Sequence, residues 1–84
     1  MPVTITLYES RFCGYCSAAK RLLERRGWPF EAINIDGRQD LFAEMEQRTG
    51  RNTVPQIFFG ERHIGGFDDL AELDQLGELD RLYQ

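Results

Sequence analysis

The short run Cys13-Gly14-Tyr15-Cys16 is the feature that most constrains this chain of 84 residues. It lies between residues 3–8, where apolar and polar side chains alternate as in a strand, and residues 14–26, where apolar side chains recur at helical spacing. A sulfur at the start of a helix faces unpaired backbone N–H groups and the positive end of the helix dipole, which stabilise a thiolate. We therefore expect Cys13 to be a nucleophile and Cys16, one turn later, to be able to form a disulfide with it.

The same spacing of two cysteines also occurs in zinc sites, or without any function. A structural zinc site usually takes four Cys or His ligands, with a second pair at similar spacing. This chain has two cysteines and a single histidine, His63, so one chain cannot supply such a site. The motif favours a redox pair, and a structural or incidental role is the simpler alternative.

Length and composition indicate one globular domain over residues 1–84, with 42% hydrophobic residues and no internal repeat. No apolar run approaches the roughly 20 residues of a membrane span, and the first residues show no export-signal pattern. Two cysteines one turn apart, with no export signal, are typical of a reducing compartment. We expect a cytoplasmic protein without membrane association.

The net charge of −4 argues against a general nucleic-acid binder. Basic residues concentrate in residues 1–26, with the CxxC motif, and acidic residues concentrate in residues 67–84. The basic half would attract an anionic thiol, although solvated helix faces explain most of these charges.

After the first helix, residues 30–35 alternate again and predict a second strand, parallel to the first because one helix connects them. A second helix follows, capped by Asp36 or Asp40 and ended by Gly50. Its expected inward side chains are Leu41, Phe42 and Met45.

Residues 51–55 are expected to form a loop, and residues 56–59 and 62–64 flank Gly60-Glu61 as an antiparallel hairpin. After Gly65-Gly66, a third helix begins at residue 67 with leucines at 70, 73 and 76, and Leu79 and Leu82 indicate a short helical turn after Gly77. The order βαβαββα predicts an α/β protein with a thioredoxin-like fold, a four-stranded mixed sheet with helices on both faces. A ferredoxin-like α+β domain is the alternative, but it gives no reason for a CxxC at the first strand-to-helix junction.

Three further segments lie at suitable distances from Cys13: Thr53-Val54-Pro55-Gln56, Gly65-Gly66 and Phe67-Asp68-Asp69-Leu70. Together with the CxxC motif they make nearly the whole chain resemble a dithiol glutaredoxin. The resemblance implies a glutathione-dependent thiol–disulfide oxidoreductase, a thioltransferase, with glutathione as co-substrate. Its partners would be glutathionylated or disulfide-containing proteins, of which a ribonucleotide reductase is one example, and without a cluster it would be a monomer.

The resemblance also assigns glutathione contacts. A cis Val54–Pro55 bond would aim the Val54 backbone at an extended ligand beside Cys13. Backbone N–H groups at the start of the third helix would bind the γ-glutamyl carboxylate, and Asp69 would bind the ammonium unless it serves only the helix dipole. The implied contacts are Arg11, Tyr15, Thr53, Val54, Pro55, Gly66, Asp68 and Asp69.

Two positions depart from the family pattern. Many members have a lysine three residues before the first cysteine, where this chain has Ser10. Arg11, Arg38 or Arg51 would then have to supply the cation for the glycine carboxylate of glutathione.

The second departure is Gly14, where the commonest family motif has proline. Some members with glycine or serine there hold a [2Fe–2S] cluster between two subunits, using the first cysteine of each chain and two glutathione thiolates. A dimer of this kind, bridged through Cys13 and acting as a cluster carrier or sensor, is the alternative function. A thioredoxin-like electron donor reduced by a flavoprotein is a third. Trp28 and His63 fall on no motif position and are expected to be structural.

Overall fold

The structure is a computed structural model that describes residues 2–84. In chain order its elements are β1 (Ile5–Glu9), α1 (Gly14–Arg25), β2 (Phe30–Asn34), α2 (Gln39–Thr49), β3 (Gln56–Phe59), β4 (Arg62–Gly65), α3 (Phe67–Gln75) and α4 (Leu79–Tyr83).

The strands form one mixed sheet in the order β2-β1-β3-β4. Strand β1 is parallel to β2 and antiparallel to β3, and β4 is antiparallel to β3. The parallel pair needs the α1 crossover, whereas β3 and β4 are joined by a tight turn at Gly60, where φ is 63°. This arrangement confirms the thioredoxin-like fold expected from the element order.

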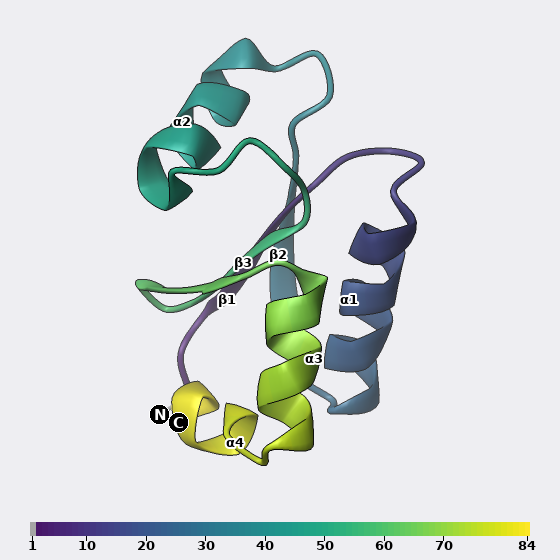
Figure 1. Ribbon diagram of the computed structural model, residues 1–84, viewed down its shortest axis with the longest axis vertical. Helices are drawn as coiled ribbons and strands as arrows, with labels where there is room; N and C mark the ends of the chain where they lie inside the picture. Colours follow the sequence, from purple (N-terminus) through teal and green to yellow (C-terminus); the bar gives the residue numbers. More distant parts are fainter. Residues whose placement is uncertain (1) are drawn as a thin grey trace.

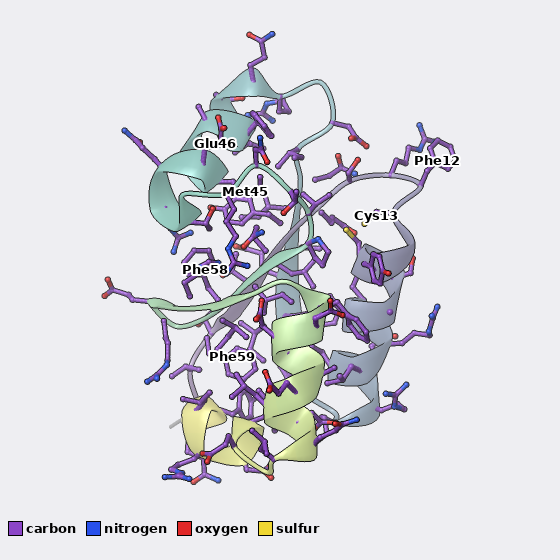
Figure 2. All side chains as sticks on the ribbon, in the orientation of Figure 1. Phe12, Cys13, Met45, Glu46, Phe58 and Phe59 are labelled. Carbon is purple, nitrogen blue, oxygen red and sulfur yellow. The ribbon has the colours of Figure 1, made fainter. Side chains whose placement is uncertain are left out.

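Helices cover both faces of the sheet, with α1 and α3 on one side and α2 on the other (Figure 1). Side chains that alternate along each strand divide between these layers. The first core is made of nine buried residues: Ile5, Leu7, Ala19, Leu22, Leu23, Ile57, Phe59, Leu70 and Leu79. The second, beneath α2, is made of Tyr8, Met45 and Phe58, so the neighbours Phe58 and Phe59 lie on opposite faces (Figure 2).

The prediction that Asp36 or Asp40 caps α2 is wrong. Arg38 occupies the cap position, and no side-chain hydrogen bond caps this helix among the described residues. Asp36 instead accepts hydrogen bonds from the loop after β1, and Asp40 pairs with Arg38. Of the side chains expected to point inward, Met45 is fully buried, whereas Leu41 and Phe42 are half-buried.

Helix α3 ends one residue before the last of the three leucines from which it was predicted. Leu76 follows its last residue as the C-cap and is 67% exposed, so it does not belong to the buried stripe. The short α4 places Leu79 in the core, and Tyr83 accepts a hydrogen bond from the Val3 N–H at 2.8 Å. The Trp28 ring stacks on Tyr83 with centroids 4.3 Å apart, which gives Trp28 the structural role that the sequence suggested.

Candidate active site at the start of helix α1

The two cysteines lie at the beginning of α1 and are both free thiols. Cys13 is the N-cap in an extended conformation, and its Sγ accepts a hydrogen bond from the Cys16 N–H at 3.1 Å. Cys13 is half-exposed, whereas Cys16 is only 1% exposed and belongs to the apolar stripe of the helix. A partner sulfur can therefore approach Cys13 from solvent, while Cys16 is almost completely covered.

The pKa of the Cys16 thiol is raised to about 12, mainly by burial and further by its hydrogen bond with Cys13. At neutral pH Cys16 thus remains protonated. A protonated thiol is a poor nucleophile, so Cys16 is unreactive at neutral pH as well as buried.

The loop before β3 lies next to the start of α1. The Val54–Pro55 peptide bond is cis, as expected, and Cys13 Sγ lies 3.9 Å from the Val54 carbonyl oxygen. The fold in this way places Val54 and Pro55, which are distant from Cys13 in the sequence, next to the Cys13 sulfur.

A groove of about 250 Å³ runs beside this point. It contains seven of the eight residues that the sequence assigned to ligand binding: Tyr15, Thr53, Val54, Pro55, Gly66, Asp68 and Asp69. The eighth, Arg11, lies in a neighbouring cavity with Cys13. Gln56 and Phe67 also line the groove, although the sequence reasoning did not assign them to it.

Asp69 marks the end of the groove at the start of α3. Its Oδ2 accepts the Gly66 N–H at 3.0 Å and lies 3.3 Å from Arg51 Nη1. The hydrogen bond from Gly66, followed by that from Arg51, lowers the pKa of the Asp69 carboxyl. At Gly65, where φ is +121°, a Cβ would lie 2.2 Å from Asp69 Oδ2, so glycine is required there for the carboxylate to approach.

Of the three arginines that could replace the family lysine, Arg51 lines this groove. Arg38 pairs with Asp40 at the start of α2, and Arg11 lines the neighbouring cavity together with Cys13. Distances along the chain could not separate these three, because the choice depends on how the loop before β3 folds back to α3.

Consecutive hydrogen bonds from His63 through Gln56 hold the loop before β3 in place. Gln56 is 1% exposed, and its Nε2 donates to the Thr53 carbonyl at 3.0 Å. Its Oε1 is 2.7 Å from His63 Nε2 on β4. His63 is thus structural, as expected, but it holds a residue that lines the groove. The signal available in the sequence was a single polar residue at the start of the apolar run Gln56-Ile57-Phe58-Phe59.

A second cavity, of about 480 Å³, is lined by Arg11, Phe12, Cys13, Cys16 and Lys20, among other residues. The sequence analysis did not single out Phe12. The structure places its ring in solvent and its backbone in the left-handed region, with φ at 55°.

Within residues 2–84 there is no group of three or more His, Cys, Asp or Glu side chains that could hold a metal ion. In the same part of the chain, no helix has the length and apolar character needed to cross a membrane.

The glutaredoxin family model matches residues 5–64 of this chain. A glutaredoxin from Neisseria meningitidis serogroup A is 50% identical over 80 residues, with 94% of each chain covered. The solution structure of a glutaredoxin from Brucella melitensis superimposes with a TM-score of 0.86 at 46% identity, covering 98% of this chain and 89% of that one. A crystal structure of a buckwheat glutaredoxin–glutathione complex gives a TM-score of 0.86 at 34% identity, covering 94% and 74%.

Proposed function

The chain belongs to the glutaredoxin family, and on this premise we propose that it is a glutathione-dependent thiol–disulfide oxidoreductase. The observation that carries the proposal is the position of Cys13, a half-exposed sulfur at a helix N-terminus beside a groove that offers both a cation and a carboxylate. A related protein of the same fold was crystallised with glutathione, which supports this choice of co-substrate.

The groove is complementary to the charges of glutathione, a tripeptide with two carboxylates and one ammonium. The γ-glutamyl carboxylate would bind backbone N–H groups at the start of α3, including that of Asp68. The ammonium would pair with Asp69, and the glycine carboxylate with Arg51. The Val54 backbone would hydrogen-bond to the extended middle of the ligand, beside Tyr15 and between Thr53 and Pro55.

In the reduction of a protein–glutathione mixed disulfide, the Cys13 thiolate attacks the glutathione sulfur. A new bond joins Cys13 to glutathione, the original S–S bond breaks, and the protein sulfur leaves as a thiolate that takes a proton from water. A second glutathione thiolate then attacks the glutathione sulfur on Cys13. Glutathione disulfide leaves and the Cys13 thiolate is regenerated, so this route uses Cys13 alone.

In the reduction of a protein disulfide, such as that of a ribonucleotide reductase, Cys13 first forms a mixed disulfide with the protein. Cys16 then loses its proton and attacks Cys13 Sγ, which releases the protein as a dithiol and leaves a Cys13–Cys16 disulfide. Two molecules of glutathione reduce this disulfide and leave as glutathione disulfide. Both routes need a pool of reduced glutathione, and we place the protein in the cytoplasm for that reason.

The test separates these routes by substitution. Cys16→Ser should retain reduction of the mixed disulfide between glutathione and 2-mercaptoethanol and should lose reduction of a protein disulfide. Cys13→Ser should lose both. Full activity of Cys13→Ser would refute the mechanism, and loss of both activities in Cys16→Ser would refute the division between the routes. Activity with thioredoxin reductase but none with glutathione would instead identify a thioredoxin-like electron donor.

A second candidate is a [2Fe–2S]-bridged dimer, favoured by the open surface at Gly14. A Cβ built on Gly14 would meet no described atom within 4 Å, so the start of α1 is unobstructed beside Cys13. One chain would contribute only the Cys13 sulfur, because Cys16 is buried, and a second chain and two glutathione thiolates would complete the four ligands. Such a cluster would supply electron storage or cluster transfer.

Anaerobic reconstitution with iron, sulfide and glutathione tests this candidate. A coloured dimer that requires glutathione would support it. A colourless monomer that still reduces the mixed disulfide would leave the redox function as the only one.

A further inference from the structure

Phe12 combines two properties that do not help the fold. Its side chain is 99% exposed, so its ring gains almost nothing from burial. Its backbone φ of 55° lies in the left-handed region, which is an outlier for a bulky residue and persists only where the surroundings impose it. Residues with these properties concentrate at functional sites, and Phe12 directly precedes the nucleophile.

The loop that carries Phe12 is held in place. The Asp36 carboxylate accepts hydrogen bonds from Ser10 Oγ at 2.6 Å and from the Arg11 N–H at 2.7 Å. The Arg11 guanidinium lies 5.6 Å from the centre of the Phe12 ring. Figure 2 shows the Phe12 side chain projecting from this loop, away from the rest of the protein. The ring is therefore presented to solvent from an anchored backbone.

Phe12 and the proposed glutathione site belong to two separate cavities. The groove that we assign to glutathione contains Tyr15, Val54 and Asp69. Phe12 lines the second cavity, together with Arg11 and Cys13. Glutathione bound in the groove would leave Phe12 and this cavity free for another molecule.

We propose that Phe12 and the cavity beside it dock the polypeptide of a disulfide-bearing protein substrate, through an apolar residue next to its target cysteine. The proposal rests on the proposed function, because it takes Cys13 as the attacking sulfur. The Cys13 thiolate bonds to one sulfur of the partner, the partner's S–S bond breaks, and its other sulfur leaves as a thiolate.

The geometry of a disulfide brings the chain of such a partner close to Phe12. Bridged cysteines have Cα atoms about 4.4–6.8 Å apart, and consecutive Cα atoms in a chain are about 3.8 Å apart. In the mixed disulfide the residues on either side of the target cysteine therefore lie near Cys13, where one of them can contact Phe12. Exposed aromatic side chains are typical anchors of such contacts, and the neighbouring Arg11 favours neutral or acidic segments over basic ones.

The experiment compares three substrates. Two are disulfide-cyclised peptides of equal net charge that carry leucine or serine beside the target cysteine. The third is the mixed disulfide of glutathione and 2-mercaptoethanol, which brings no flanking polypeptide.

The variants are Phe12→Ala, Phe12→Asn, which tolerates a left-handed backbone, and Phe12→Leu, which keeps an apolar side chain. Leu76→Ala removes another exposed apolar side chain, far from the site in sequence, and is the matched control.

We expect Phe12→Ala and Phe12→Asn to lower kcat/KM for the leucine peptide about tenfold, mainly through KM, and to change the small mixed disulfide less than twofold. Phe12→Leu should keep most of the activity, and wild-type protein should prefer the leucine peptide to the serine peptide. Unchanged reduction of the leucine peptide by Phe12→Ala would overturn the proposal, as would an equal loss on all three substrates. Inactivity of wild-type protein on the small mixed disulfide would instead contradict the proposed function, and the docking proposal with it.

Discussion

Arg51 Nη1 lies 3.3 Å from Asp69 Oδ2, and both side chains line the groove beside Cys13. Because both are close to half-exposed, this ion pair is worth at most about 1 kcal/mol and opens easily. Glutathione brings an ammonium and a carboxylate that can replace the two partners. In the proposed complex, one internal ion pair is exchanged for two with the ligand, and Asp69 keeps its hydrogen bond from the Gly66 N–H.

The first prediction concerns Asp69. Asp69→Asn keeps an acceptor for the Gly66 N–H but removes the charge that would pair with the ligand ammonium. A charged hydrogen bond contributes about 1.5–3 kcal/mol, so the KM for glutathione should rise about tenfold or more. Alkylation of Cys13 by iodoacetamide should keep its rate. Glu72→Gln, which removes another carboxylate from α3, is the control and should change neither, and an unaltered KM in Asp69→Asn would exclude an ionic role for this side chain.

The second prediction is a pH dependence of stability that arises at His63. Burial, and then the charge of Arg51, lowers the pKa of His63 below its ordinary value of about 6.5. Between the lowered folded value and about 6.5, the unfolded chain binds more protons than the folded one, so stability rises with pH through this window. Below the window the cost of protonating His63 is fully present, and above it the cost is absent.

His63→Gln tests this assignment, because the chain has one histidine and a glutamine side chain can still donate to Gln56 Oε1. Urea unfolding at pH 5.0 and pH 7.5 should show a smaller difference in free energy for the variant than for wild-type protein. An identical difference would mean that other groups cause the dependence.

The third prediction concerns the contact that fastens α4 to the end of α1. Arg26 Nη1 lies 2.5 Å from Asp74 Oδ1, Nη2 binds Asp80, and the guanidinium stands 4.5 Å from the centre of the Trp28 ring. An exposed ion pair contributes about 0.2–1 kcal/mol and a cation–π contact about 0.5–1 kcal/mol. Arg26→Ala should therefore lower the free energy of unfolding by about 1–2 kcal/mol. Arg25→Ala, on the exposed side of the same turn, is the control, and equal effects of the two would show that general charge, not the contact, matters.

The regular parts of the fold could be predicted because each expresses a local rule. Alternation along β1 and β2, helical spacing in α1 and the Gly60 turn all depend on residues close together in the sequence. Asp36 shows where local rules fail. Aspartate favours helix caps, yet this carboxylate bonds to Ser10 and Arg11, more than 20 residues earlier, because β1 and β2 end side by side.

The candidate site likewise has parts that could be predicted from the sequence and parts that depend on the folded chain. The CxxC motif and the Thr53-Val54-Pro55 segment could be assigned by their similarity to a family, but their meeting at Cys13 is a property of the folded chain. The choice of Arg51 over Arg11 and Arg38 depends on tertiary contacts that no spacing expresses. No sequence pattern distinguishes Phe12, because an aromatic side chain is ordinarily expected in the core and its 99% exposure is a property of the folded chain.

The last prediction uses two glycines that differ in one respect. Gly14 is the first residue of α1, where proline is favoured, and Cys13 before it is extended at φ −114° and ψ 107°, as a residue preceding proline prefers. A Cβ at either Gly14 or Gly77 would meet no described atom within 4 Å, but Gly77 has φ at +73°, which a proline ring cannot adopt. Gly14→Pro should stabilise the fold by about 0.4–1 kcal/mol by restricting the unfolded chain, whereas Gly77→Pro should destabilise it by more. For a domain of this size the first change raises Tm by roughly 2–8 °C, measurable by calorimetry.

Reduction of the small mixed disulfide by Gly14→Pro should continue, because Cys13 and the groove are unchanged. A lower Tm in Gly14→Pro would mean that the start of α1 needs the conformational freedom of glycine. Comparison of the two substitutions shows whether the backbone angle or the available space determines the effect of proline on stability.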